Sequence, residues 1–414
     1  MSQWEPVWRV KIDGVSYTSV ILANLAIVSG RRTIYEQAQA GYVSIELIET
    51  SQATIPVFIN STITVEIQNT SSTWIPIFGG NVSDVDLAIR DVGSIMFTQT
   101  YTIIALGALA RLQKALTDGV LAKAHDGTQI SVLLQDLLLQ TWGEVPAALA
   151  WNTYDLTGDW ANAGNIGLGE IDVPGDYELA NRASSVNDFY SIVSALATSG
   201  LGYIYEDGQG RISYADSTRR SQYLSANGYV NLTANQARAN GLKQTTRAGD
   251  VRNYVTIKYG STGSSETTAS DAESILQYGT LAQVIDTTIF SGTDAAAQAA
   301  FYLAIRKTPQ PIFAEITFDL TNPELDNADR DALIGVFMGM PISLADLPPN
   351  MGSIFQGFVE GWSFRAGYKR LSITMTVSPV AYSLQSLEWG EISSSYLWSG
   401  VSPTLDWARA TIIT

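Results

Sequence analysis

The sequence has no cysteine and only one histidine. Without cysteine the chain has no disulfide, no thiolate metal ligand and no cysteine nucleophile. A run of 18 apolar residues is also absent, as is the pattern of a cleaved signal peptide. We therefore predict a chain without a membrane-spanning segment that is made and assembled as a soluble protein.

Charge is scarce and mostly negative. Charged residues make up 15% of the 414 residues, and 40 acidic residues against 24 basic ones give a formal net charge of −16. An average globular protein carries roughly a quarter charged residues. The negative balance repels phosphate backbones, so we predict no sequence-specific contact with nucleic acid. The few basic pairs are Arg31-Arg32 and Arg219-Arg220.

The feature that is present, and that carries most information, is a repeated strand-turn-strand pattern. Its two copies lie roughly 280 residues apart and agree in spacing as well as in residues. In each copy a β-like segment ends ten positions before the shared motif, and another strand follows it. The structural motif residues are Ile77, Phe78, Gly80 and Val82 in the first copy, and Ile354, Phe355, Gly357 and Val359 in the second.

This repeat, with short alternating segments and Gly, Asn and Ser turns, predicts a β-rich α+β chain with two related β-barrels. The predicted domains are a first barrel at 1–116, an inserted helix-plus-hairpin region at 117–240, a second barrel at 241–385 and an aromatic tail at 386–414. We expect the tail to dock on a partner through its tryptophans, Trp389, Trp398 and Trp407.

Apolar periodicity places several elements within these domains. Helices are predicted at 129–141, capped by Asp126 or Thr128, and at 186–198, capped by Ser184 or Ser185. A third helix, capped by Asp294, is predicted from Asp294 to about Lys307, and the acidic run 323–331 begins a fourth. Residues 55–59 are predicted as a strand, 207–210 as a hairpin turn and 260–269 as a flexible loop.

Catalytic constellations are weak in this sequence. His125 has no Gly-x-Ser-x-Gly nucleophile elbow to serve, and its simpler role is in a turn before a helix. The carboxylate sets Asp84 with Asp86, and Asp326 with Asp329 and Asp331, suit a solvated strand and an acidic first helical turn. We predict no enzyme, no cofactor and no metal site. A cell-wall hydrolase using these carboxylates, or a glycan-binding adhesin using aromatics of 142–160, remains an alternative.

Three segments carry a family resemblance: residues 29–32 (SGRR), 76–84 (PIFGGNVSD) and 355–362 (FQGFVEGW). In these the chain resembles the tail-tip baseplate hub proteins, or minor tail proteins, of long-tailed siphophages, which correspond to the N-terminal hub part of tail-associated lysins. The resemblance implies a structural virion protein at the distal end of the tail. It also implies a homotrimer whose two barrels alternate into a ring of six.

Such a ring implies particular partners. It links the hexameric tail tube and the distal tail protein to threefold tip, fibre or receptor-binding proteins, it meets the tape measure protein, and DNA passes through its lumen. Lysins of this family carry an enzyme domain after the hub, and here only a short tail follows the second barrel. We therefore expect the hub function alone.

Overall fold

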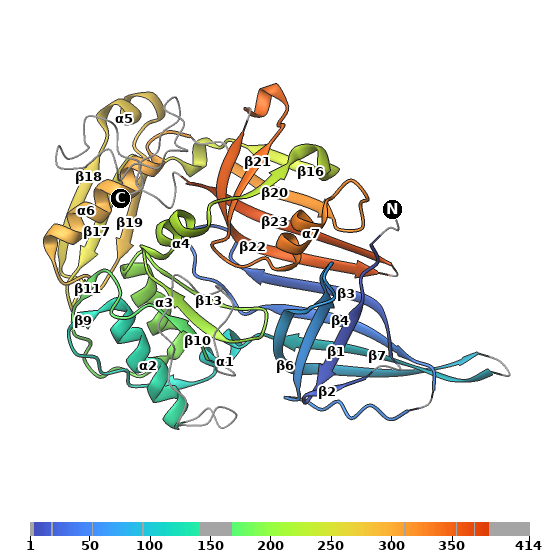
Figure 1. Cartoon of the computed structure of the whole chain (residues 1–414). Helices are drawn as coiled ribbons and strands as arrows, with labels where there is room; N and C mark the ends of the chain where they lie inside the picture. The colour runs from blue at the N-terminus through green and yellow to red at the C-terminus, as the bar shows by residue number, and fades with distance from the viewer. Residues whose placement is uncertain are drawn as a thin grey trace.

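The computed structural model describes residues 4–17, 20–51, 53–92, 95–140, 168–309, 312–352, 354–367 and 369–380. Most of the described strands belong to one sheet of 13 strands, with two smaller α/β regions packed at one end of the molecule (Figure 1). No described helix is both long and apolar enough to cross a membrane.

The first β unit comes from the N-terminal part of the chain. Its strands follow the order β3-β4-β7-β6-β5-β1-β2. Their bounds are β1 Trp8–Ile12, β2 Val15–Ser16, β3 Val20–Gly30, β4 Tyr42–Glu49, β5 Thr62–Gln68, β6 Trp74–Val92 and β7 Ile95–Leu106. The strand predicted at 55–59 is wrong: this segment is a loop that exposes Phe58 and Ile59. Pro56 is the second residue of this segment and has no backbone N–H to donate to a neighbouring strand, which disfavours pairing.

The second β unit has the same strand order, β16-β20-β23-β22-β21-β15. Its strands are β15 Val230–Thr233, β16 Ala237–Thr245, β20 Ile312–Asp319, β21 Pro341–Ala345, β22 Phe355–Gly367 and β23 Arg370–Pro379. The units differ in that β15 runs parallel to β21 whereas β1 runs antiparallel to β5. The shared order confirms that the chain holds two related β units.

Neither unit shows a hydrogen-bonded closure between its end strands in the described residues. In the first unit a cleft of about 320 Å³ lies between β1 and β3 and is lined mainly by apolar side chains, among them Trp8, Val10 and Ile21. The two units therefore form curved parts of one continuous sheet, joined edge to edge through β3 and β22.

A helical region follows the first unit. Its elements are α1 Leu109–Leu112, β8 Leu116–Thr117, β9 Ala124–His125, α2 Asp126–Gln140, β10 Leu168–Ile171, β11 Glu178–Leu179, β12 Asn187–Asp188, α3 Phe189–Ser199, β13 Tyr203–Glu206, β14 Ile212–Ala215 and α4 Arg219–Asn227. The predicted helices and the hairpin at 207–210 are present. The cap of α3 is Asp188, which accepts a hydrogen bond from the Ser191 amide, and not Ser184 or Ser185.

A second α/β region is inserted between β16 and β20. It consists of β17 Tyr254–Tyr259, β18 Ser265–Ser270, α5 Ala272–Tyr278, β19 Ala282–Asp286 and α6 Gly292–Arg306. The loop predicted at 260–269 is partly wrong, because residues 265–270 pair with β17 along its whole length. Helix α6 is capped by Ser291, not Asp294, whereas α7, Asn327–Ile334, begins in the acidic run as predicted and is capped by Asp326.

Candidate functional site

The two β units meet at one strand pair. Strand β3 runs antiparallel to the second half of β22, from Gly30 opposite Gly361 to Leu25 opposite Ala366. The two backbones approach closely at the glycine end. A Cβ atom added to Gly30, whose φ is +85°, would lie 2.4 Å from the carbonyl oxygen of Glu360. A larger residue at this position would push the two units apart. We call this strand pair the seam.

A buried carboxylate anchors the seam. The side chain of Glu360 is 1% exposed and accepts hydrogen bonds from Arg31 Nε at 2.7 Å and from Arg220 Nη1 at 2.7 Å. Arg220 Nη2 donates a further hydrogen bond at 2.9 Å, and the Ser378 hydroxyl donates a fourth. Burial alone would raise the pKa of Glu360, but the two guanidinium groups lower it to about 2. The carboxylate is therefore ionised and pairs one arginine from the first unit with one from α4.

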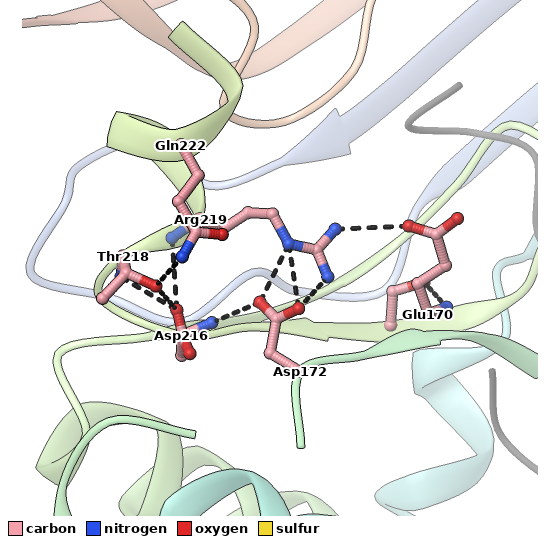
Figure 2. A network of polar contacts seen from close by, with 7 residues as sticks. Glu170, Asp172, Asp216, Thr218, Arg219 and Gln222 are labelled. Carbon is pink, nitrogen blue, oxygen red and sulfur yellow. Dashed lines mark hydrogen bonds and ion pairs between the residues drawn. The ribbon is translucent and has the colours of Figure 1, made fainter. Parts of the chain in front are cut away.

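The adjacent arginine of α4 faces the other way. Arg219 is fully buried, and its guanidinium binds Asp172 and, at 3.2 Å, Glu170 (Figure 2). Asp172 also accepts a hydrogen bond from the Asp216 amide at 3.0 Å. Burial raises the pKa of Glu170 to about 7, although Arg219 acts against this shift. The two adjacent arginines therefore connect the helical region to the seam. Arg219 binds carboxylates of the helical region, and Arg220 binds Glu360 at the seam.

The β13–β14 hairpin of the helical region contacts the first β unit. Its turn packs on the first unit, where a Cβ on Gly79 would lie 2.3 Å from backbone atoms of Gln209, and a Cβ on Gly208 would lie 2.3 Å from the Pro76 carbonyl oxygen. Glu206 is buried at the base of the turn and accepts hydrogen bonds from the amides of Gly41 and Leu109.

Burial raises the pKa of Glu206 to about 7, and the two backbone amides act in the opposite direction. The arrangement at the hairpin is therefore a close backbone contact backed by a buried carboxyl. It joins the helical region to the first unit, and the Arg220–Glu360 ion pair joins it to the second.

The predicted motif residues occupy equivalent positions in the two β units. In the first, Phe78 lies opposite Val65 and Gly80 opposite Ile63. In the second, Phe355 lies opposite Leu344 and Gly357 opposite Ile342. A Cβ on either glycine would lie 2.3 Å from a carbonyl oxygen of the next strand, that of Leu106 or Ser378.

The match extends beyond the motif. A register shift follows Val82 in β6, and another follows Val359 in β22, so both strands have a bulge one residue after the motif ends. The residues at the two bulges are Ser83 and Glu360. Of the eight motif residues, Ile354 differs most from its counterpart, because it is exposed whereas Ile77 is buried.

The residues considered for catalysis are dispersed. His125 is exposed on β9, opposite Glu178. Asp84 and Asp86 are exposed on β6. Asp326 caps α7, and Asp331 accepts hydrogen bonds from the amide and hydroxyl of Thr70. In the part of the chain that the structure describes, no three His, Asp or Glu side chains are grouped to hold a metal ion.

Two sets of predicted aromatic residues cannot be placed. Trp389, Trp398 and Trp407 lie outside the described residues, and so do the aromatics of 142–160. The residues that sequence reasoning missed are Arg31, Arg220 and Glu360. The available signal was the pairing of two adjacent arginines, twice, in a chain with so little positive charge.

No family model and no curated protein matches the sequence. Solved structures do match. The 43 kDa tail protein of prophage MuSo2 from Shewanella oneidensis has a TM-score of 0.56 at 14% identity, over 90% of this chain and 98% of that one. The tail protein from Neisseria meningitidis MC58 has a TM-score of 0.56 at 10% identity, over 92% of this chain and 98% of that one.

The chain has the fold of these tail proteins. The alignments cover 90% or more of this chain and 98% of each of the other two, so the shared fold extends over the β units and the α/β regions alike. At this level of identity the likeness concerns the fold, and residues such as Glu360 are characterised by their own contacts in this chain.

Proposed function

We propose that the chain is a structural subunit of a bacteriophage tail, and specifically the hub at the distal tail tip. The observation that carries this proposal is the seam. Two units with one strand order are joined side by side in a continuous sheet, and a buried ion network fixes their relative position. The tail-protein fold supports the same role.

In this proposal three copies form a ring in which the two β units alternate. Subunits with two near-equivalent units give three chains a nearly sixfold arrangement, which matches a hexameric tube on one side and threefold proteins on the other. The partners are the distal tail protein, the tape measure protein and tip or fibre proteins, and DNA passes through the lumen without specific contact. In this proposal the chain divides into four domains, at 1–116, 117–240, 241–385 and 386–414. The last is a docking tail that contains Trp389, Trp398 and Trp407.

The mechanism is assembly, not bond breaking. The charged side chains at the centre of the molecule pair with one another, and the geometry gives them a structural use. The acidic character of the chain, with a net charge of −16, suits a conduit along which DNA slides without binding.

Light scattering coupled to size-exclusion chromatography, over a range of concentrations, tests this function. We expect the mass of three 44.7 kDa chains. Averaged electron micrographs of that peak should show a ring with six similar lobes. A monomer at every concentration, combined with release of sugar or peptide from purified cell walls, would replace the hub proposal with the hydrolase alternative.

A further inference from the structure

The seam uses only one of two equivalent strand edges. The first half of β22 pairs with β21, and its second half, 361–366, pairs with β3. Strand β6 is built in the same way: its first half, up to Asn81, pairs with β5. Beyond Val82, no described strand pairs with the outer edge of β6. Among the strands that the structure describes, this leaves a free edge at the place where β22 has a partner.

The exposed side chains on this free edge correspond to buried ones at the seam. Counting from the shared motif and bulge, Leu87 is the counterpart of Phe364, and Ile89 is the counterpart of Ala366. Phe364 and Ala366 are 1% and 5% exposed, whereas Leu87 and Ile89 are 54% and 65% exposed. Large apolar side chains that stand in solvent at such an edge indicate a surface that becomes covered.

A matching edge exists at the other end of the sheet. Strand β16 occupies the place in the second unit that β3 occupies in the first, and its outer edge has no described strand beside it. Leu242 of β16 lies opposite Ile316, as Leu25 of β3 lies opposite Ile45. The chain therefore carries both halves of a second seam, at two edges that lie on different units.

The charged residues of the two free edges, on β6 and β16, have opposite signs. Asp84 and Asp86 are exposed on the free edge of β6, and Lys243 and Arg247 are exposed on and just after β16. Transferring the register of β3 and β22 places Asp84 near Arg247. An acidic edge that meets a basic edge favours pairing between them over pairing of either edge with itself.

We propose that the outer edge of β6, residues 84–89, pairs antiparallel with β16 of a second copy of this chain, with Ala88 opposite Lys243 and Ile89 opposite Leu242. The contact repeats the internal seam between subunits. It is heterologous, because each copy offers β6 to one neighbour and β16 to the other, and such contacts give a ring when the rotation between copies closes. The inference rests on the proposed hub function for the ring and adds the surface and register by which copies join.

Cysteine cross-linking tests the register directly, because the natural chain has no cysteine. Residues directly opposite in an antiparallel pair have Cα atoms roughly 4.5 to 5.5 Å apart, within the range of a disulfide. The double variant Ala88→Cys/Lys243→Cys, oxidised mildly at a concentration where the protein assembles, should give covalent species of two and three chains on a non-reducing gel. Reduction should return them to one chain.

The matched control is Ala88→Cys/Arg247→Cys. Four residues along a strand displace the second cysteine by roughly 13 Å, at about 3.3 Å per residue, so this pair should not cross-link. Each single variant should give no species larger than a disulfide dimer. A third variant, Ile89→Lys, changes a side chain that is exposed in the single chain, so its circular dichroism should match the wild type while its mass falls to one chain.

The outcomes separate the two proposals. A protein of three-chain mass that cross-links through the Arg247 variant and not through the Lys243 variant, or through neither, overturns this pairing and leaves the hub function standing. A three-chain mass that survives Ile89→Lys also overturns it. A wild-type monomer at every concentration, with no cross-link in either double variant, overturns both.

Discussion

Replacing Glu360 with glutamine should strongly destabilise the folded chain. The substitution keeps the size of the side chain but removes the negative charge that Arg31 and Arg220 share at 1% exposure. Two buried guanidinium groups then lack their counter-ion, and breaking a buried ion pair in this way costs roughly 3–5 kcal/mol. We expect a loss of this size in the free energy of unfolding at pH 7, measured by urea denaturation followed through tryptophan fluorescence.

The pH dependence provides a second readout of the same carboxylate. Its pKa falls from 4.5 to about 2 in the folded state. The folded state therefore binds fewer protons than the unfolded state between these values, so the contribution is present above pH 4.5 and is lost as the pH falls toward 2. At about 1.4 kcal/mol per pKa unit, this amounts to about 3 kcal/mol. The stability gap between wild type and Glu360→Gln should narrow over this range.

A matched control separates this effect from the loss of any ion pair. Glu5 pairs with Lys369 at 3.0 Å, but both side chains are more than half exposed. Glu5→Gln should change the free energy of unfolding by less than about 1 kcal/mol. Equal effects of the two substitutions at pH 7, or a gap for Glu360→Gln that does not change between pH 4.5 and 2, would refute the reasoning.

Three further predictions concern the same junction. Gly30→Ala should lower the melting temperature much more than Gly14→Ala, because both glycines have positive φ but only Gly30 has a backbone carbonyl in the way; equal shifts would mean that the seam is not tightly packed. Gly80→Ala and Gly357→Ala should destabilise the protein to a similar degree, since each added Cβ would meet a carbonyl oxygen at 2.3 Å; differential scanning calorimetry would show whether one is tolerated. Because burial raises the pKa of Glu206 from 4.5 to about 7, the folded state binds more protons between these values, and this contribution to stability falls by roughly 3 kcal/mol as the pH rises through the window. Urea titrations at pH 5 and pH 8 should therefore show a larger advantage of wild type over Glu206→Gln at pH 5, and an advantage independent of pH would contradict the assignment.

The repeated β units could be predicted from the sequence because their signal is local. A strand such as β4 shows its alternation of buried and more exposed residues within eight positions, Tyr42–Glu49. The hairpin turn at 207–210 is equally local, since its Asp and Gly residues set the backbone conformation. Strand β18 was missed because its Ser, Thr and Gly neighbourhood is typical of loops, and its pairing with β17 decides its conformation.

The ion network could not be predicted for a different reason. Arg31 and Glu360 are 329 residues apart in the sequence, and no periodicity links them. Their contact depends on the register of β3 with β22, which is set by two close-packed glycines at the end of that pair. Of the four arginines in the two basic pairs, Arg31, Arg219 and Arg220 are buried ion-pair partners.

The separation of Arg31 and Glu360 also has a consequence for synthesis of the chain. At roughly 5 to 20 residues per second, a ribosome completes Glu360 about 15 to 65 s after Arg31. During that interval the first β unit can fold, but the edge of β3 that later pairs with β22 is still open and Arg31 has no carboxylate partner. An unpaired edge of this kind invites association with other nascent chains. The last strands to be made, β22 and β23, therefore end the period in which aggregation competes with folding.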